Sequence, residues 1–328
     1  MRQCSPMPVR AVASPSGSDL DAAWAVVAQR LAPTPLVPAP ALGDDVLLKL
    51  ETLQPTGSFK VRGALAALSR VGGAPVITAS AGNAGLGVAW AAAALGVQAT
   101  VVVAETASPA KIAALSALPV TLIRHGDDYD EAEAHALAAR GATYVSSYND
   151  TGVIAGQSTI GRELDAQLPA APLVACPLGG GSLSSGLGLW AAGRPGAFVV
   201  AVEAERSPGF SSALSAGAIT PIEVGETLAD GLAGNIEAGA VTFELVRDHV
   251  AAVVSVSEPE IEEAIRFLAR AHGVVAEGAG AAAVAAVMAG RVERGDGPLV
   301  VLVTGRNIAL DRLAAVLGED LRRNSCMS

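Results

Sequence analysis

The sequence predicts an α/β fold with two open, twisted, mainly parallel sheets flanked by helices. Short runs of β-branched and other apolar residues alternate along the chain with longer stretches rich in Ala and Leu. Strands that are apolar throughout, each followed by a helix, are typical of parallel sheets covered on both faces. These units continue over most of the 328 residues, which indicates two sheets and not one.

The predicted strands are short apolar runs bounded by Gly, Pro or polar residues. In chain order they are VLLKL from Val46, PVITAS from Pro75, ATVVVA from Ala99, VTLIRH from Val120, PLVACPLGGG from Pro172, FVVAVEA from Phe198 and PLVVLVTG from Pro298. The predicted helices between them are KVRGALAALSRV from Lys60, NAGLGVAWAAAALG from Asn83, PAKIAALSAL from Pro109, YDEAEAHALAARG from Tyr129, GQSTIGRELDAQL from Gly156, SEPEIEEAIRFLARAHG from Ser257 and GAGAAAVAAVMAG from Gly278.

Composition narrows the class of protein. With 51% hydrophobic and 16% charged residues the chain can bury a large core, and its net charge of -10 argues against nucleic acid or an anionic membrane as partner. A small-molecule ligand fits better. The three cysteines (Cys4, Cys176 and Cys326) have no metal-ligand or disulfide spacing, so a reduced cytoplasmic location is expected.

No segment of the sequence is expected to cross a membrane or to direct secretion. The N-terminal residues contain no apolar signal segment, and we expect residues 1–25 to form a loose arm. The most apolar window, from Leu86, is divided by Gly96 and Gln98 into a helix and a strand. After Asn307 we expect one short helix and a tail, with no regulatory domain.

Four strand-to-helix junctions carry residues of chemical interest. They are Gly57-Ser58-Phe59-Lys60, Ser80-Ala81-Gly82-Asn83-Ala84-Gly85, Gly179-Gly180-Gly181-Ser182-Leu183 and Thr304-Gly305-Arg306-Asn307. In open α/β sheets such junctions lie at the carboxyl ends of the strands, where ligands bind. We therefore expect them to meet at one site.

Two of these junctions indicate a covalently held phosphate compound. Three consecutive glycines between a strand and a helix let backbone N–H groups approach an anion, although a tight turn also needs glycine. The run matches neither nucleotide-binding pattern, so the anion should belong to something smaller. Lys60, in a chain with few lysines, sits among small and apolar residues. A lysine in such a setting together with a phosphate site suggests pyridoxal phosphate held as a Schiff base.

The ordered series of motifs resembles the serine/threonine dehydratase group of the fold-type II pyridoxal phosphate enzymes, the tryptophan synthase β-like fold. This group includes threonine ammonia-lyases and serine racemases. The similarity runs from about Thr34 to about Asn307 and includes VIAGQSTIGRE from Val153 and LADGLA from Leu228. It implies a small domain of residues 72–148 and a large cofactor-binding domain of residues 26–71 and 149–328. It also implies a homodimer.

The resemblance assigns roles to individual residues. Lys60 would hold the cofactor and act as the general base on the substrate α-carbon, because a desolvated lysine has a lowered pKa. Phe59 and Gly231 would lie on the two faces of the pyridine ring, Asn83 would bind the ring hydroxyl, and Thr304 would contact the pyridine nitrogen. The phosphate would bind Gly179, Gly180, Gly181, Ser182 and Leu183; the substrate carboxylate would bind Ser80, Ala81, Gly82, Asn83 and Ala84.

Most of these residues also have a purely structural interpretation. Phe59 fits ordinary core packing, Ser80 and Asn83 fit plain N-caps, and Lys60 fits a lysine snorkelling at a helix start. Glu277 matches a family glutamate near the active site, but it also suits a helix N-terminus.

Several residues depart from the family pattern. Ser182 stands where a fourth glycine is usual, and Ala81 replaces the second serine of racemases, which favours elimination. Gly209 stands where a second acidic metal ligand would lie near Glu203, so no required metal ion is expected. The segments Ala84-Gly85-Leu86 and Ser146-Ser147-Tyr148 differ from the family and leave the substrate open. Arg306 would bind a distal substrate carboxylate or, as the favoured interpretation, pair with a surface acid.

The function predicted from these features is an ammonia-lyase that converts a β-hydroxy amino acid such as serine or threonine to a 2-oxo acid and ammonia. A hydroxyl at Thr304 leaves the pyridine nitrogen neutral, which favours prompt loss of a β-substituent. The alternatives are β-replacement of the cysteine-synthase type, a racemase, and a catalytically silent cofactor-binding scaffold.

Overall fold

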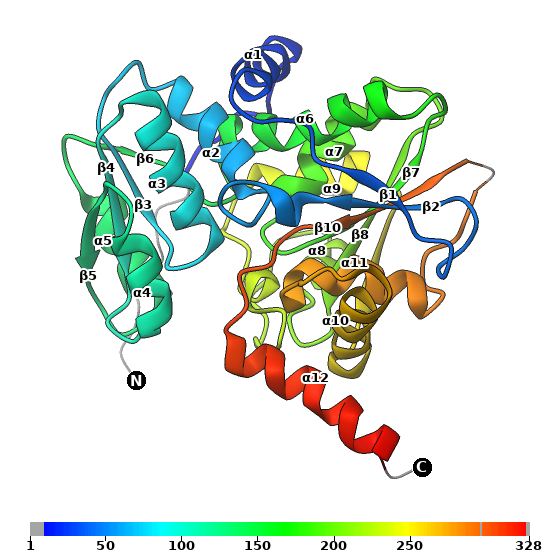
Figure 1. Cartoon of the computed structure of the whole chain (residues 1–328). Helices are drawn as coiled ribbons and strands as arrows, with labels where there is room; N and C mark the ends of the chain where they lie inside the picture. The colour runs from blue at the N-terminus through cyan, green and yellow to red at the C-terminus, as the bar shows by residue number, and fades with distance from the viewer. Residues whose placement is uncertain (1–9, 296, 326–328) are drawn as a thin grey trace.

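Two sheets form the framework of the chain, as the sequence predicts (Figure 1). The structure is a computed structural model that describes residues 10–295 and 297–325. The larger sheet has six strands in the order β1-β2-β10-β7-β8-β9, and the smaller has four in the order β5-β4-β3-β6. Only the β1–β2 pair is antiparallel; the other pairs of neighbouring strands are parallel.

All seven predicted strands are present. The strands are β1 (Leu36–Pro38), β2 (Val46–Leu50), β3 (Val76–Ala79), β4 (Ala99–Val103), β5 (Thr121–Arg124), β6 (Thr143–Tyr144), β7 (Leu173–Pro177), β8 (Phe198–Ala204), β9 (Ala252–Val256) and β10 (Leu299–Val303). The sequence analysis did not predict β1, β6 and β9. Strands β1 and β6 are very short, and β9 has one end exposed to solvent, so their local patterns are weak.

The seven predicted helices are also present, together with others that were not predicted. The helices are α1 (Gly17–Ala28), α2 (Lys60–Ser69), α3 (Asn83–Leu95), α4 (Pro109–Ser116), α5 (Tyr129–Ala138), α6 (Thr151–Gln167), α7 (Ser182–Ala192), α8 (Gly209–Ala216), α9 (Val241–His249), α10 (Glu258–His272), α11 (Gly278–Met288) and α12 (Leu310–Ser325), with short 3₁₀ turns η1 (Glu51–Leu53) and η2 (Asp230–Leu232). Helix α12 is longer than the single short helix expected after Asn307.

Helix α1 lies within the segment expected to be a loose arm. Ser16 and Asp19 form a reciprocal capping box at its start, which satisfies backbone donors that a helix N-terminus otherwise leaves free. Ala23 and Val27 on its inner face are buried. The helix is therefore packed into the fold from residue 17, whereas residues 1–9 lie outside the described part.

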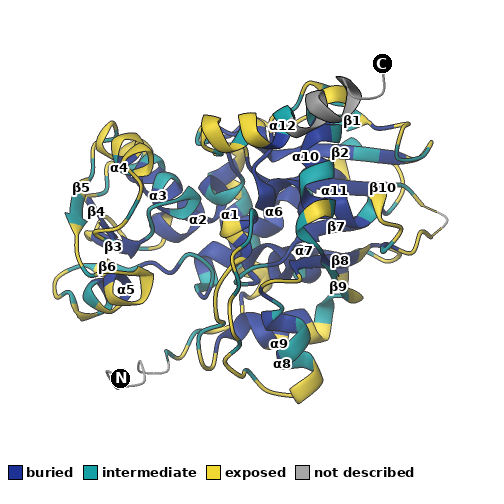
Figure 2. Ribbon diagram, turned by 90° about the horizontal axis from the view of Figure 1, so that it is seen from below, coloured by how far each residue is buried: buried dark blue, intermediate teal, exposed yellow. Residues whose placement is uncertain are grey.

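The larger sheet is buried on both faces (Figure 2). Strand β10 at its centre is buried along its whole length, and the register pairs Leu299 with both Val46 of β2 and Leu173 of β7. On one face the Ala-rich helix α11 is almost entirely buried, because its small side chains allow close approach to the strands. Helices α6 and α7 contribute to the cluster on the other face.

Helix α2 joins the two sheets. Its residues Val61 and Leu65 share one hydrophobic cluster with Val76 of β3, Val88 of α3 and Val153 of α6. Against α6 the backbones come close: a Cβ on Gly156 would lie 2.5 Å from the carbonyl oxygen of Arg62. The start of α2, where Lys60 lies, is thus held between the two sheets. No helix in the described part of the chain is long and apolar enough to traverse a membrane.

Candidate active site

The first and fourth junctions are joined by backbone hydrogen bonds. Ser58 and Gly305 form an isolated antiparallel bridge. Next to it the amide of Phe59 donates to the carbonyl of Thr304 at 3.0 Å, and the amide of Arg306 donates to the carbonyl of Gly57 at 2.9 Å. Two motifs far apart in the sequence therefore form one piece of structure, with Lys60 directly after it.

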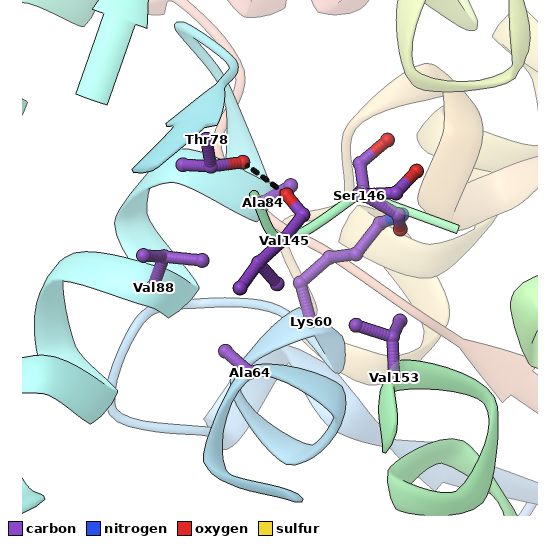
Figure 3. A pocket seen from close by; sticks show the side chains of 9 residues that line it. Lys60, Ala64, Thr78, Ala84, Val88, Val145, Ser146 and Val153 are labelled. Atoms are coloured by element: carbon purple, nitrogen blue, oxygen red, sulfur yellow. Dashed lines mark hydrogen bonds between the residues drawn. The ribbon is translucent and has the colours of Figure 1, made fainter. Parts of the chain in front are cut away.

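Lys60 is the first residue of α2, and its amine is held at the site (Figure 3). The Nζ atom donates to the carbonyl oxygen of Ser147 at 2.9 Å and lies 5.3 Å from the centre of the Phe59 ring. The residue is partly buried. Burial lowers the pKa of Lys60 to about 8, against an opposing effect of the Glu277 carboxylate.

A small cavity of about 10 Å³ lies beside the Lys60 side chain, about the space that one water molecule needs. Most of its wall is apolar; the lining residues besides Lys60 are Ala64, Thr78, Ala84, Val88, Val145, Ser146, Ser147 and Val153. The hydroxyl of Thr78 is occupied by the carbonyl of Val145 at 2.8 Å. An ammonium group is poorly solvated in such surroundings, which accounts for the lowered pKa of Lys60.

Asn83, from the second junction, contacts the fourth junction and Glu277. Its Nδ2 donates to Glu277 Oε1 at 2.6 Å, and its Oδ1 accepts from Asn307 Nδ2 at 2.6 Å. Asn307 Nδ2 also donates to the carbonyl of Thr56 at 2.8 Å. The amide of Glu277 donates to the carbonyl of Gly305 at 3.0 Å. Glu277, which the sequence analysis left open, is therefore part of the site.

Glu277 is buried, and its charge is disfavoured. Burial and the nearby Asp230 carboxylate raise the pKa of Glu277 to about 7, while the side chain of Asn83 and the backbone N–H of Asn307 counteract part of this effect. Glu277 therefore changes its protonation state near neutral pH.

The segment from Ser80 to Ala84 follows β3 and opens α3. The hydroxyl of Ser80 accepts from the amide of Gly82 at 3.2 Å, and Gly82 is the N-cap of the helix. Ala81 packs in the apolar cluster of Leu115, and Ala84 lines the cavity beside Lys60. The free N–H groups at a helix start suit a carboxylate.

The glycine run connects β7 to α7 under tight steric constraint. A Cβ on Gly180 would lie 2.3 Å from the Tyr148 ring, and one on Gly181, whose φ is 89°, would lie 2.6 Å from the Phe210 ring. A Cβ on Gly179 would lie 3.0 Å from Leu232 Cα, next to Gly231. No side chain can replace these hydrogens without displacing a neighbour.

The surroundings of the glycine run fit a phosphate group. Ser182 and Leu183 form the buried first turn of α7, where backbone N–H groups and the helix dipole favour an anion. The hydroxyl of Thr242 is buried near Gly181 and has no hydrogen-bond partner in the part of the chain that the structure describes. Such an orphaned donor is expected where a ligand belongs. The residues present therefore fit the phosphate of pyridoxal phosphate, with Lys60 for its aldehyde.

The ring-binding residues predicted from the sequence lie around the same site. Thr304 is buried at the end of β10, and the side chain of Phe59 packs against the cluster that contains Leu302. Gly231 lies in η2, where a Cβ would be 3.1 Å from the side chain of Ala279. The backbone contacts of Gly179 with Gly231 and of Phe59 with Thr304 link these residues in two pairs.

Two side chains with an open role in the sequence can now be placed. Glu203 caps α8: its oxygens accept from the amides of Phe210 at 2.6 Å and Ser211 at 3.0 Å. Within residues 10–295 and 297–325 no group of three or more His, Cys, Asp or Glu side chains is arranged to hold a metal ion. Arg306 is exposed and forms no ion pair with a described residue, unlike the surface pair that the sequence analysis favoured.

A buried network of charges below Lys60 was not predicted. Arg62 forms ion pairs with Glu51 at 2.7 Å and Glu163 at 2.6 Å, and Lys49 pairs with Glu163 at 2.6 Å. All four side chains are at most 2% exposed. Burial opposes the charge of Arg62, but the two carboxylates raise its pKa overall. The lysine within the apolar strand VLLKL was the sequence signal that could have revealed the network.

Tyr148 and Ser147 were seen only as departures from a pattern, yet both contact the site. Ser147 supplies the carbonyl that holds Lys60. The Tyr148 ring lies against Gly180, and its hydroxyl accepts from the amide of Glu237 at 2.8 Å. Neither role has a local signal in the sequence.

Comparisons with known proteins agree on one family. Residues 27–305 match the sequence profile of the family described as pyridoxal-phosphate dependent enzyme. L-threonine ammonia-lyase of Thermotoga maritima is 38% identical over 287 residues, which cover 85% of this chain and 71% of that protein.

Two solved structures are similar over most of the chain. A threonine deaminase of the source abbreviated T.th. is 36% identical, with a TM-score of 0.82 and coverage of 90% of this chain and 99% of that one. Serine racemase of maize is 25% identical, with a TM-score of 0.86 and coverage of 95% and 100%. The chain belongs to the family of pyridoxal-phosphate dependent enzymes, and pyridoxal phosphate is its cofactor.

Proposed function

We propose that the protein is an ammonia-lyase that removes water and ammonia from a β-hydroxy amino acid, serine or threonine being the first choice, to give a 2-oxo acid. The observation that carries the proposal is the environment of Lys60: a partly buried amine with a pKa of about 8, placed where the junction motifs meet. The similarity to threonine ammonia-lyase and threonine deaminase supports the same reaction.

Lys60 would hold the cofactor and move the substrate α-proton. When bound, pyridoxal phosphate supplies an electron sink for the charge that develops at the substrate α-carbon. With a pKa of about 8, about a tenth of the Lys60 amine is neutral at pH 7 and can accept a proton at Nζ. The carbonyl of Ser147, 2.9 Å from Nζ, limits where this amine can point.

The other junctions would bind and orient. Gly179 to Leu183, with the free hydroxyl of Thr242, would hold the phosphate. Phe59 and Gly231 would enclose the ring, while Asn83 and Thr304 would meet its polar atoms. Thr304 brings a hydroxyl and no charge, so it does not force a proton onto the pyridine nitrogen. The start of α3, Ser80 to Ala84, would bind the substrate carboxylate.

The residue after Ser80 favours elimination over racemisation. Ala81 presents only a methyl group, which packs in the cluster of Leu115 and Leu86. A racemase needs a second proton carrier on the face opposite the lysine, and a methyl group cannot supply one. Racemisation should therefore be weak at most.

The test is the release of 2-oxo acid from serine and threonine by the protein loaded with pyridoxal phosphate. Release without any added nucleophile supports the proposal. Turnover that requires an added thiol or sulfide would show β-replacement, inversion of the α-carbon without keto-acid release would show a racemase, and a coloured protein inert to all these substrates would be a scaffold.

The covalent role of Lys60 has its own test. Borohydride should fix the cofactor irreversibly to the native protein, and peptide mass analysis should place it on Lys60. Lys60→Ala should lose this attachment and the activity. Lys111→Ala is the matched control, because the Lys111 side chain is 45% exposed and forms an ion pair with Asp230; it should keep the attachment. Attachment that survives in Lys60→Ala would refute the assignment.

We also propose that residues 72–148 form the smaller domain and that the enzyme acts as a cytoplasmic homodimer. The four strands of the smaller sheet all fall between residues 76 and 144, which supports the first point. However, the boundary at residues 71 and 72 falls within the hydrophobic cluster that α2 shares with β3. Light scattering of the purified protein tests the dimer.

A further inference from the structure

We propose that Glu277 and Asn307 are positioning residues that fix the carboxamide of Asn83 in one orientation, so that one N–H of Asn83 points to the ring oxygen of the cofactor as a hydrogen-bond donor. The inference rests on the proposed function only in placing Asn83 at the cofactor ring. It adds how Asn83 is oriented and by which side chains.

The orientation follows from which groups can donate. Glu277 Oε1 lies 2.6 Å from one end of the Asn83 carboxamide, and an ionised carboxylate can only accept. The amide nitrogen of Asn83 must therefore face Glu277. The other end, Oδ1, faces the amide nitrogen of Asn307 at 2.6 Å, and that nitrogen is itself fixed by the carbonyl of Thr56 at 2.8 Å. Each end thus confirms the other.

A count of the hydrogens leaves one donor for a ligand. A carboxamide nitrogen carries two hydrogens. Asn307 uses one for Thr56 and one for Asn83, whereas Asn83 uses one for Glu277. The second hydrogen of Asn83 Nδ2 has no described partner. A donor here stabilises a negatively charged ring oxygen, since hydrogen bonds to charged acceptors are the stronger ones.

The contacts also join the two sheets across the site. Asn83 opens α3 beside the smaller sheet, whereas Glu277 caps α11 and Asn307 follows β10, both on the larger sheet. The three side chains can meet only when the start of α3 lies against the loop after β10. The orientation of Asn83 is therefore coupled to the closed arrangement of the two sheets.

Glu277 makes this device sensitive to pH. The charged groups that face it are Asp230 of η2, Lys111 of α4 and Lys60 of α2. Its pKa of about 7 means that Glu277 gains its charge as the pH rises through neutrality, and the hydrogen bond from Asn83 then becomes charge-assisted. The grip on Asn83 should accordingly tighten above pH 7.

The experiment compares cofactor binding by Asn307→Asp, Glu277→Gln and the native protein. Asn307→Asp keeps the shape but turns the donor into an acceptor, so Asn83 faces acceptors at both ends. The affinity for pyridoxal phosphate, measured by titration, should fall on the order of tenfold, which is the effect of one lost hydrogen bond. The matched control is Asn235→Asp, an exposed amide bonded to Ile222, which should bind like the native protein.

Glu277→Gln removes the charge without removing the acceptor. In the native protein the visible absorbance of the bound cofactor should change with pH with a midpoint near 7, and this component should vanish in Glu277→Gln. Circular dichroism and urea denaturation establish that each variant is folded; if Asn307→Asp is not, the Glu277→Gln titration alone decides.

The outcomes separate this inference from the proposed function. If folded Asn307→Asp binds the cofactor as the native protein does, or if the pH titration of Glu277→Gln matches the native one, the positioning role is refuted. The proposed function is unaffected as long as keto acid is released and borohydride attaches the cofactor at Lys60. Failure of that attachment would instead refute the function.

Discussion

Lys60 illustrates how a single side chain acquires reactivity from its neighbours. An ordinary lysine is charged at neutral pH, but the wall of valines and alanines around Lys60 offers the charge no solvation. The carbonyl of Ser147 still gives the amine one hydrogen-bond acceptor, so it is not left unpaired. The balance of these effects places the pKa of Lys60 at about 8, where the neutral and charged forms interconvert readily.

The raised pKa of Glu277 predicts a pH dependence of stability. The ordinary pKa of a glutamate is about 4.5, and that of Glu277 in the folded protein is about 7. Between these values the folded protein binds more protons than the unfolded chain, so the free energy of unfolding falls as the pH rises from about 4.5 to 7. The shift corresponds to roughly 3 kcal/mol.

The measurement is urea denaturation of the cofactor-free protein at several pH values between about 4.5 and 8, the range that spans both pKa values. The free energy of unfolding of the native protein minus that of Glu277→Gln isolates the contribution of Glu277, because the other groups titrate alike in both. This difference should decrease with rising pH and level off above about 7. A difference that stays constant over the range would contradict the raised pKa.

The residues that the sequence could identify are those whose type is unusual at a junction. Lys60 and the glycine run have this property, because an amine among apolar residues and three successive glycines need a reason. Asn307 and Tyr148 do not: their roles depend on Asn83 and on Gly180, which are distant in sequence. Contacts of this kind leave no local pattern, so only the folded chain reveals them.

At the scale of elements, the start of α2 is anchored from below by buried charges. Arg62 lies two residues after Lys60 and binds Glu51 of η1 through two hydrogen bonds of 2.7 and 2.8 Å. It also binds Glu163 of α6, which in turn binds Lys49 of β2. Three elements are thereby tied to the helix that presents Lys60.

Removal of one charge from this network should destabilise the protein strongly. Glu163→Gln leaves two buried cations with one carboxylate, and breaking a buried ion pair in this way costs about 3–5 kcal/mol. Denaturation in urea should show the loss. Glu105→Gln, at an exposed pair with Arg124, should leave the denaturation midpoint almost unchanged.

The network prediction would fail if Glu163→Gln unfolded at the same urea concentration as Glu105→Gln. In that case water or a shifted side chain would have to compensate the lost charge. A further expectation concerns the site: if α2 loosens, the Lys60 amine gains access to water, and the pKa of Lys60 should rise from about 8 toward its ordinary value.

Helices and strands with a regular apolar pattern were predictable, and the rest followed tertiary contacts. Strand β10 is apolar along its length and was recognised at once. Strand β6 has two residues and exists because it pairs with β3. Helix α8 opens with Gly209 and depends on Glu203 as its cap, a contact that the local sequence does not indicate.

At the scale of the whole molecule, the segment after residue 9 connects both sheets to the site. Arg10 donates to both carboxylate oxygens of Glu237 at 2.8 Å and to the carbonyl of Asn149 at 3.0 Å. Its guanidinium lies 5.0 Å from the centre of the Tyr144 ring, at the end of the smaller sheet. Glu237 in turn donates its amide to Tyr148, whose ring supports Gly180.

Loss of the Arg10 side chain should therefore affect both stability and the cofactor. Arg10→Ala leaves the partly buried Glu237 without its cation, and the loss of charge-assisted hydrogen bonds costs about 2 kcal/mol. Because Tyr148 loses a fixed partner, the glycine run should bind pyridoxal phosphate several-fold more weakly. Urea denaturation and cofactor titration measure the two effects.

A double-mutant cycle tests whether the effect passes through Glu237. Arg10→Ala and Glu237→Ala should each weaken cofactor binding, and the double variant should be little worse than either one, because both changes break the same contact. Arg124→Ala, which removes an exposed arginine paired with Glu105, is the control and should change neither quantity. If the effects of Arg10→Ala and Glu237→Ala add fully, the two residues act independently, and the N-terminal segment supports the phosphate site by another route.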